Sequence, residues 1–347
     1  MYKIAIAGAS TQLGKELKET LEESSLVAST FVLLDEADAH GQLEQVGDEV
    51  TIVRAIEPDS FEKVDFSFFC GTEDLTRRHW RQALRSGSTV LDLSGALDRE
   101  PGVLVRAPWL GSGSLGVDAP AVDLFTPAVV PAHPATLALA LLVERLQQAA
   151  PVRFVAATVL LPASEFGRAA MDELHQQTVS LLSFQALPRL VFDAQTSFNL
   201  ITGLGESAKI SLSALEARIR RQYEGLTGGR GPIVSLQVVQ APVFHGHTFS
   251  LFVELERPVE LSALEDALSG DHVDLVLEDT DSPSNLAVTG QNDVLVRMRP
   301  EFSGSRNTNE ASRLWLWAAS DNLRLYAQNA VQCALDLRRI RPQGTVQ

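Results

Sequence analysis

The sequence predicts an α/β protein of two domains, with an N-terminal doubly wound parallel sheet followed by an α+β domain. Three observations predict this organisation. A strand, a glycine turn and an amphipathic helix open the chain; buried strands then alternate with helices; and from about residue 127 longer β runs appear with interspersed helices. With 347 residues the chain can build two well-buried cores. We expect a first domain at residues 1–127, completed by a C-terminal helix at 321–347, and a second domain at 128–320.

Composition narrows the class of protein. Apolar residues make up 45% and charged residues 21%, as in ordinary globular proteins. A net charge of −15 argues against a nucleic-acid partner, which needs a basic footprint. The longest strongly apolar stretch, residues 137–143, is too short to cross a bilayer, and the N-terminus resembles a strand rather than a cleavable signal. Two cysteines, Cys70 and Cys333, suit a reducing compartment. We therefore expect a soluble cytoplasmic protein without a membrane partner.

The first predicted strand, residues 3–7, runs into the sequence GASTQLG and then into a helix with Leu13, Leu17 and Leu21 at a spacing of four. Gly8 would permit a tight turn, and Gly14 would let the helix pack closely on the strand. Free amides at the helix N-terminus would then bind a pyrophosphate. The predicted contacts to a dinucleotide come from Gly8, Ser10, Thr11, Gln12, Leu13 and Gly14. Thr11 stands at the middle glycine position and should restrict backbone approach. The alternative is a turn whose glycines serve packing alone.

The second strand, residues 30–34, ends at the acidic pair Asp35 and Glu36. An acid at this point commonly binds a ribose hydroxyl, which favours NAD over NADP; a solvated loop acid is the alternative. Residues 64–70 and 89–94 are predicted as further buried strands around a helix at 74–85. Cys70 ends one of them, and we interpret it as a buried small hydrophobic residue rather than a nucleophile.

The second domain is predicted from longer β runs. Its expected strands are residues 153–161, 231–243, 247–256 and 294–298, and its expected helices are 136–148 and 211–223. The latter helix carries Arg218, Arg220 and Arg221, interpreted as a solvated face or the rim of a dimer, with a phosphate site as the alternative. A last helix, from about residue 321 to 337, should return to pack on the first domain.

Seven segments in sequence order resemble the aspartate-semialdehyde dehydrogenase family over essentially the whole chain. They are GASTQLG, FSFFCGT, TVLDLSGALD, PASEFGR, SFNL, QAPVFHGH and ASDNLR. The resemblance implies a Rossmann-like first domain, a glyceraldehyde-3-phosphate-dehydrogenase-like substrate and dimerisation domain, and a homodimer. In that family an NADP-dependent enzyme reduces aspartyl phosphate to the semialdehyde through a thioester on a cysteine, which requires a thiolate and a general base.

The nucleophile is the first point of departure from the family. Its active-site signature falls on residues 131–136 and places Pro134 at the cysteine position. Proline has no thiol, so it cannot attack a carbonyl. His133 beside it is interpreted as a capping or supporting residue rather than a replacement catalyst. The general-base histidine of the family matches His247, although a structural role is the alternative and His245 lies nearby in sequence.

The resemblance also places the family's substrate-binding residues on unsuitable side chains. The orienting glutamine falls on Leu161 and the carboxylate-binding arginine on Gln240. A paired Glu and Lys fall on Ala214 and Ala217, and a phosphate-binding arginine falls on Asp98, with Arg99 adjacent. Loss of these charges leaves an acidic substrate without its partners.

The cofactor positions are better kept. Ser164 and Gly167 match the ends of the segment that lines the nicotinamide pocket, while Glu165 and Phe166 replace its centre. Asn322 lies in the late loop that contacts the cofactor in the family. Asp38 falls near the arginine that binds the 2′-phosphate of NADP, where an acid would repel that group. We expect NADP or NAD as cofactor, with weak or lost affinity, and no metal.

Three functional hypotheses follow. The favoured one is a Usg-type paralogue of the family that lacks the catalytic cysteine and persists as a dimeric binding or regulatory protein. The second is an active NAD(P)-dependent semialdehyde dehydrogenase of aspartate-family amino-acid biosynthesis that uses another nucleophile. The third is an NAD(P)-binding enzyme of a different reaction that kept only His247.

Overall fold

The computed structural model describes residues 2–26, 28–36, 41, 43–46, 49–111, 122–123, 126–277, 281–301 and 309–340. The chain divides into two compact units. Unit 1 consists of Met1–Trp109, Pro120–His133 and Tyr326–Gln347, and unit 2 of Leu110–Ala119 and Pro134–Leu325. The division falls after His133 rather than after residue 127, because strand β9 (Ala128–Pro131) still belongs to the sheet of unit 1. The C-terminal part of unit 1 likewise begins at Tyr326 rather than at residue 321.

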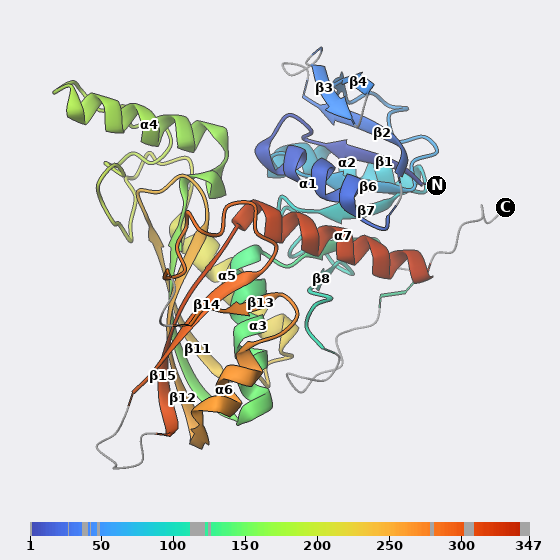
Figure 1. Cartoon of the computed structure of the whole chain (residues 1–347). Helices are drawn as coiled ribbons and strands as arrows, with labels where there is room; N and C mark the ends of the chain where they lie inside the picture. The colour runs from blue at the N-terminus through green and yellow to red at the C-terminus, as the bar shows by residue number, and fades with distance from the viewer. Residues whose placement is uncertain are drawn as a thin grey trace. The chain divides into compact units, whose positions relative to one another are not determined.

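Unit 1 contains a seven-stranded parallel sheet in the order β5-β2-β1-β6-β7-β9-β8 (Figure 1). This sheet confirms the predicted doubly wound arrangement. Strand β1 has β2 on one side and β6 on the other, so the strand order reverses beside it, where such sheets bind ligands. Besides β9, the sheet of unit 1 contains β1 (Tyr2–Ala7), β2 (Ala28–Asp35), β5 (Arg54–Ala55), β6 (Phe66–Phe69), β7 (Thr89–Asp92) and β8 (Leu104–Arg106). The helices of unit 1 are α1 (Gln12–Glu23), α2 (Glu73–Arg85) and most of α7 (Asn322–Ile340). A separate hairpin joins β3 (Leu43–Val46) to β4 (Glu49–Ile52).

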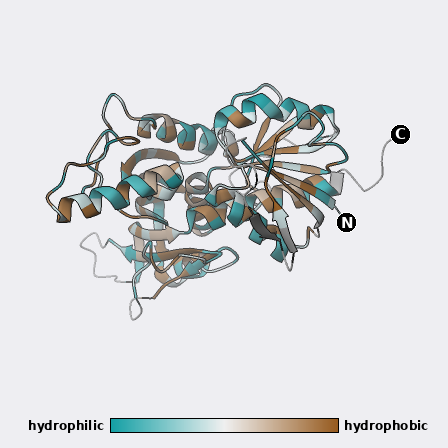
Figure 2. Ribbon diagram, turned by 90° about the horizontal axis from the view of Figure 1, so that it is seen from above, coloured by the Kyte–Doolittle hydropathy of each residue, from teal (hydrophilic) through white to brown (hydrophobic). Residues whose placement is uncertain are grey.

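Both faces of this sheet are covered. Along β1, Ile4 and Ile6 join a core with Leu17 of α1 and Ala330 of α7, whereas the alternate residues of the strand join a second core with α2. Figure 2 shows the consequence, with hydrophobic strands lying between helices that carry hydrophilic residues on their outer sides. The final helix thus completes the first unit, as expected from the sequence.

Unit 2 contains a six-stranded mixed sheet in the order β11-β10-β12-β15-β14-β13. Its elements are α3 (Pro134–Ala149), β10 (Val152–Leu161), η2 (Ala163–Phe166), α4 (Arg168–Leu182), α5 (Leu212–Leu226), β11 (Ile233–Gln240), β12 (His247–Glu260), α6 (Leu261–Leu268), β13 (Val273–Leu275), β14 (Val294–Pro300) and β15 (Glu310–Ser320). Helix α3 is apolar almost all round and packs against α5, α6 and β10, so it is buried rather than amphipathic.

Five elements of unit 2 were not predicted from the sequence. Helices α4 and α6, the short helix η2 and strand β13 were left out, and β15 lies between β12 and β14 in the sheet although no strand was expected there. Its run Leu314, Trp315, Leu316, Trp317 alternates between buried and exposed side chains, as a strand with one covered face should. Within the described part of the chain, no helix is both long and apolar enough to span a bilayer.

Candidate functional site

The turn between β1 and α1 needs both of its glycines. Gly8 has a φ of +90°, and a Cβ added there would lie 2.3 Å from the backbone nitrogen of Gly71. A Cβ on Gly14 would lie 2.3 Å from the carbonyl oxygen of Gly8. These distances are far below van der Waals contact, so any side chain at either position would force the backbone apart. The tight turn and the close packing predicted for Gly8 and Gly14 are therefore present.

Thr11 caps the helix that follows this turn. Its φ and ψ of −71° and 158° are extended, and its Oγ1 accepts a hydrogen bond from the amide of Gly14 at 2.9 Å. The same hydroxyl lies 2.7 Å from the carbonyl oxygen of Gly8, to which it donates. The amides of Gln12 and Leu13, at the first turn of α1, have no hydrogen-bond partner among the described residues. The glycine cradle and these two donors suit the pyrophosphate of a dinucleotide, even though a threonine replaces the middle glycine.

Asp35 is not placed as either sequence-based interpretation expected. Its side chain is buried, with 6% of the residue exposed, so it is not a solvated loop acid. One carboxylate oxygen accepts from the amide of Ser10 at 2.9 Å and from its hydroxyl at 2.5 Å. The other accepts from the amide of Glu36 at 2.8 Å. The acid therefore fixes the β1–α1 turn from within, and its burial leaves little of the carboxylate accessible to a ribose.

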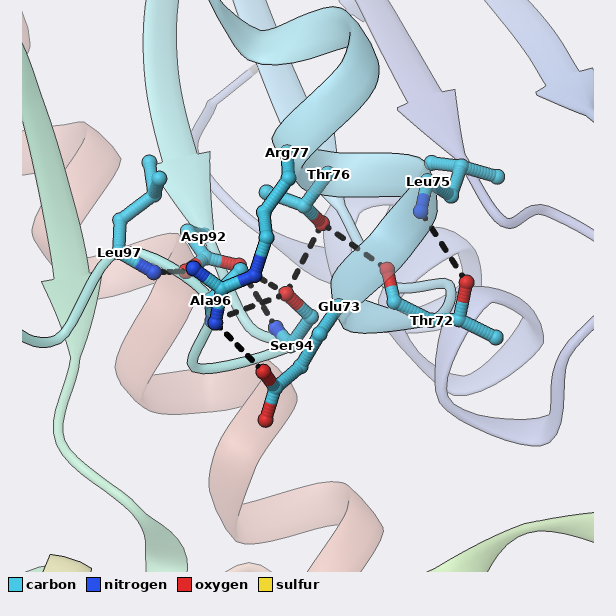
Figure 3. Close-up of polar contacts among 9 residues, drawn as sticks. All are labelled: Thr72, Glu73, Leu75, Thr76, Arg77, Asp92, Ser94, Ala96 and Leu97. Carbon is cyan, nitrogen blue, oxygen red and sulfur yellow. Dashed lines mark hydrogen bonds and ion pairs between the residues drawn. The ribbon is translucent and has the colours of Figure 1, made fainter.

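A similar arrangement follows β7 (Figure 3). Asp92 is fully buried, and it accepts from the amide and hydroxyl of Ser94 on one oxygen and from the amide of Leu97 on the other. The Ser94 hydroxyl also bonds Thr76 of α2 at 2.9 Å. This network fixes the loop that carries Asp98, the position where the family resemblance expects a phosphate-binding arginine. Asp98 is half-buried and Arg99 is exposed.

Helix α3 begins at Pro134, directly after β9 and two intervening residues. Proline suits the first position of a helix because the amide it lacks would have no partner there. The buried His133 before it lies with its ring centroid 6.1 Å from that of Tyr326, which supports the interpretation of a packing residue. The position of the expected nucleophile is thus occupied by a helix-starting residue that has no reactive group.

Neither cysteine of the chain offers a replacement. Cys70 at the end of β6 and Cys333 on α7 are both buried. Burial raises the pKa of the Cys70 thiol far above its usual range, and the charges of Asp92 and Asp35 raise it further. Burial likewise raises the pKa of Cys333. Both groups remain neutral thiols, whereas thioester chemistry requires a thiolate.

His247 and Glu165 form a close pair in unit 2. The Nε2 of His247 lies 2.9 Å from a carboxylate oxygen of Glu165, and the histidine side chain is fully buried. The glutamate comes from η2, the segment where the family resemblance expects small residues beside the nicotinamide. The candidate base His247 therefore has a carboxylate next to one ring nitrogen, unlike an imidazole in solvent.

Asn322 connects the segments around this pair. Its Oδ1 accepts from the hydroxyl of Ser164 at 3.2 Å and from the amide of Gly246 at 3.1 Å. It therefore holds η2 and the turn before β12 together. Gly167, with a φ of +79°, ends η2 and leads into α4. Of the predicted cofactor residues, Ser164 and Asn322 are in direct contact, and Gly167 lies on the same short segment as Ser164.

The expected substrate-binding positions lie on two elements. Leu161 and Gln240 are paired across β10 and β11, and both are fully buried. Ala214 and Ala217 lie on α5 and are exposed, whereas Glu216 between them accepts a hydrogen bond from the amide of Val238. None of these four positions bears a charge. Asp38, the remaining position, lies outside the described residues. Within the described residues, no group of three or more metal-ligating side chains occurs.

Sequence reasoning missed Glu165 as the partner of His247. Its position was noted only as a change in the nicotinamide segment, because a separation of 82 residues gives no local pattern. It also missed the inward orientation of Asp35, which depends on the hydroxyl of Ser10. A serine two residues after Gly8 was the only signal available.

Comparisons with known proteins cover nearly the whole chain. A family model described as "Semialdehyde dehydrogenase, NAD binding domain" matches residues 3–137, and one described as "Semialdehyde dehydrogenase, dimerisation domain" matches residues 143–325. A protein of Azotobacter vinelandii named "USG-1 protein homolog" is 30% identical over 332 residues, which is 95% of this chain and 96% of that protein. An aspartate-semialdehyde dehydrogenase of Rickettsia bellii is 26% identical, covering 97% of each chain.

Solved structures agree on the fold. A probable aspartate-semialdehyde dehydrogenase from Pseudomonas aeruginosa has a TM-score of 0.82 at 28% identity and covers 97% of this chain and 98% of its own. Aspartate semialdehyde dehydrogenase II from Vibrio cholerae has a TM-score of 0.85 at 22% identity and covers 98% of each chain. With both domain models matched in order and a full-length relative at 30% identity, this chain belongs to the semialdehyde dehydrogenase family.

Proposed function

We propose that this chain is a homodimeric, dinucleotide-binding member of the family that does not carry out the thioester-forming reaction for which its aspartate-semialdehyde dehydrogenase relatives are named. The observation that carries the proposal is Pro134 at the start of α3, where the family resemblance requires a cysteine. A covalent acyl intermediate needs a nucleophilic atom at this point, and proline supplies none. Cys70 and Cys333, buried and neutral, do not take over this role.

The substrate shell supports the same proposal. Leu161 and Gln240 stand where a glutamine and an arginine would orient and neutralise an acidic substrate, and both are buried against each other. A buried carboxylate without a cationic partner loses a charge-assisted hydrogen bond, which is worth about 1.5–3 kcal/mol. Restoring the thiol alone therefore does not rebuild the site.

Turnover of aspartate semialdehyde tests the proposal. The purified protein is incubated with the semialdehyde, inorganic phosphate and NADP or NAD, and reduced nucleotide is followed by absorbance beside an active relative as positive control. The expected result is no turnover above background for the wild type and for Pro134→Cys. Wild-type turnover that disappears in His247→Ala would overturn the proposal. Strong activity in Pro134→Cys would show that the substrate shell is intact, against the argument from Leu161 and Gln240.

A second candidate function rests on the 2.9 Å contact between His247 and Glu165. A histidine oriented by a carboxylate can act as a general acid or base without any covalent intermediate. This candidate is a nucleotide-dependent reaction that needs proton transfer but no thioester. Oxidation of NADH or NADPH with a panel of small aldehydes and 2-oxo acids tests it, and activity must fall in His247→Ala for the candidate to stand.

The homodimer is proposed through α4 and the segment that follows it. The dimerisation-domain model covers this region, and large apolar side chains are exposed there. They are Val179, Leu182, Phe184, Leu190, Phe198 and Leu200, and Phe184 is 100% exposed. Exposure of this many large apolar residues is typical of a protein interface.

The segment after α4 is fixed although it contains no regular structure. Buried Glu173 of α4 accepts from the amides of Val191 and Phe192, and buried Gln177 bonds the carbonyls of Pro188 and Ala194. These contacts fix the backbone of residues 188–194 before any partner binds, which reduces the ordering cost of association. A second copy of the chain is the partner that the family model indicates.

A further inference from the structure

A protein that distinguishes NAD from NADP needs a side chain near the adenosine ribose. Asp35 does not serve this purpose, because it stabilises the β1–α1 turn. Its carboxylate is buried and accepts hydrogen bonds from Ser10 and from the amide of Glu36. In sheets of this kind the acid at the end of the second strand contacts the ribose hydroxyls, and an arginine in its place accepts the 2′-phosphate of NADP. Among the described residues, the exposed acid at this point is Glu36, which follows β2 directly.

Glu36 projects outward from the end of β2, with 43% of its side chain exposed. It forms an ion pair with Arg78 of α2, and the Nε of the same arginine lies 3.0 Å from a carboxylate oxygen of Asp74. Strand β2 and the β6–α2 segment flank β1 on its two sides. The pair thus joins the two elements that border the β1–α1 turn, at the end of the sheet where the dinucleotide is expected.

We infer that Glu36 selects the unphosphorylated adenosine ribose and makes this chain an NAD(H)-preferring protein. The inference rests on the nucleotide binding included in the proposed function and does not depend on any catalytic activity. A carboxylate accepts hydrogen bonds from ribose hydroxyls, which are donors. The oxygens of a 2′-phosphate are acceptors and carry about −1.5 to −2 charge, so they would face Glu36 and Asp74 as like charges.

Arg78 does not reverse this preference, because it is engaged by both carboxylates. Glu36, Asp74 and Arg78 together carry one net negative charge. NADP binding through Arg78 would require the guanidinium to leave at least one of these partners. Removal of the Glu36 carboxylate would release the arginine and at the same time remove a repulsive charge, so a single substitution should change the preference.

Binding measurements on the full-length protein test the inference. Dissociation constants for NADH and NADPH are determined by calorimetry for the wild type, for Glu36→Ser and for Glu73→Gln. The control changes a matched exposed pair, Glu73–Arg77 at 2.7 Å, which lies on α2 alone and does not reach β2. The wild type should bind NADH about tenfold or more tightly than NADPH, the scale of one charge-assisted hydrogen bond. Glu36→Ser should lose this preference, and Glu73→Gln should keep it.

Each other outcome overturns the inference. Equal or tighter binding of NADPH by the wild type would do so, as would an unchanged ratio in Glu36→Ser. Binding of neither nucleotide would overturn it together with the proposed nucleotide binding. The proposed absence of thioester chemistry would be untouched in that case, because the turnover assay tests it separately.

Discussion

Leu161 and Gln240 are register partners across the parallel strands β10 and β11, and the Nε2 of Gln240 donates to the carbonyl oxygen of Leu161 at 3.2 Å. The same nitrogen lies 2.8 Å from the carbonyl oxygen of Ala241. Two positions that the family resemblance assigns to an acidic substrate are therefore neighbours, and the amide that could meet a substrate is bonded to the backbone. The two departures from the family belong to one local structure rather than to separate sites.

The first prediction concerns Gln240→Arg, the substitution that would restore the expected cation. Gln240 is fully buried and its Nε2 donates to the backbone carbonyl oxygens of Leu161 and Ala241, so the new guanidinium would replace an amide whose partners are neutral. The free energy of unfolding should fall by about 3–5 kcal/mol, the cost of an uncompensated buried charge. Urea unfolding measures this. Gln237→Arg is the control, because Gln237 lies on the same strand and is exposed, and it should change stability by less than about 0.5 kcal/mol. Equal stability of the two variants would contradict the argument.

The second prediction concerns the reactivity of Cys70 and Cys333. The thiolate is the reactive form and exists above the pKa of the thiol, and burial raises that pKa in both residues. A change from about pH 7 to about pH 9 should therefore give almost no increase in labelling of the native protein by a thiol reagent, unlike an ordinary cysteine, whose pKa is about 8.5. Both residues should react after denaturation in guanidinium. Rapid labelling of either cysteine in the native protein at about pH 7 would show that a nucleophile is present after all.

Much of the first unit was predictable because its signals are local. The β1–α1 turn is encoded by Gly8 and Gly14 within seven residues, and both serve the predicted steric purpose. Helix α7 was likewise predicted to return to the first domain, and its apolar residues do join that core. The resemblance to the family, which orders seven such segments, gave the fold of the second unit as well.

The remainder depends on contacts between distant residues. The hydroxyl of Ser10 determines whether Asp35 faces solvent, a ribose or its own loop. The hydrophobic periodicity of the sequence gives no information about this contact. The pairing of Glu165 with His247 arises only once η2 and β12 are placed by the sheet. The boundary after His133 depends on β9 pairing with β7, which a four-residue apolar run does not reveal.

The third prediction concerns Glu165→Ala. The substitution leaves the buried Nε2 of His247 without its carboxylate, and a buried polar atom that loses its partner costs about 1–3 kcal/mol. Thermal unfolding should show a lower Tm for this variant. Glu165→Gln is the matched control, since its amide oxygen can still accept a hydrogen bond from the imidazole. A Tm for Glu165→Ala at or above that of Glu165→Gln would mean that the pair does not stabilise the unit.

The last prediction concerns the exposed apolar residues after α4. Leu182 and Phe184 are 71% and 100% exposed, and burial against a second copy would contribute roughly 1.5–3 kcal/mol for each fully covered side chain. The double variant Leu182→Asp, Phe184→Asp should therefore dissociate at concentrations where the wild type sediments as a dimer. Leu286→Asp is the control, because Leu286 is 80% exposed in the same unit but lies outside this region. It should remain dimeric. A wild type that sediments as a monomer would contradict the proposed homodimer. A double variant that stays dimeric, with unchanged unfolding, would place the interface on another surface of unit 2.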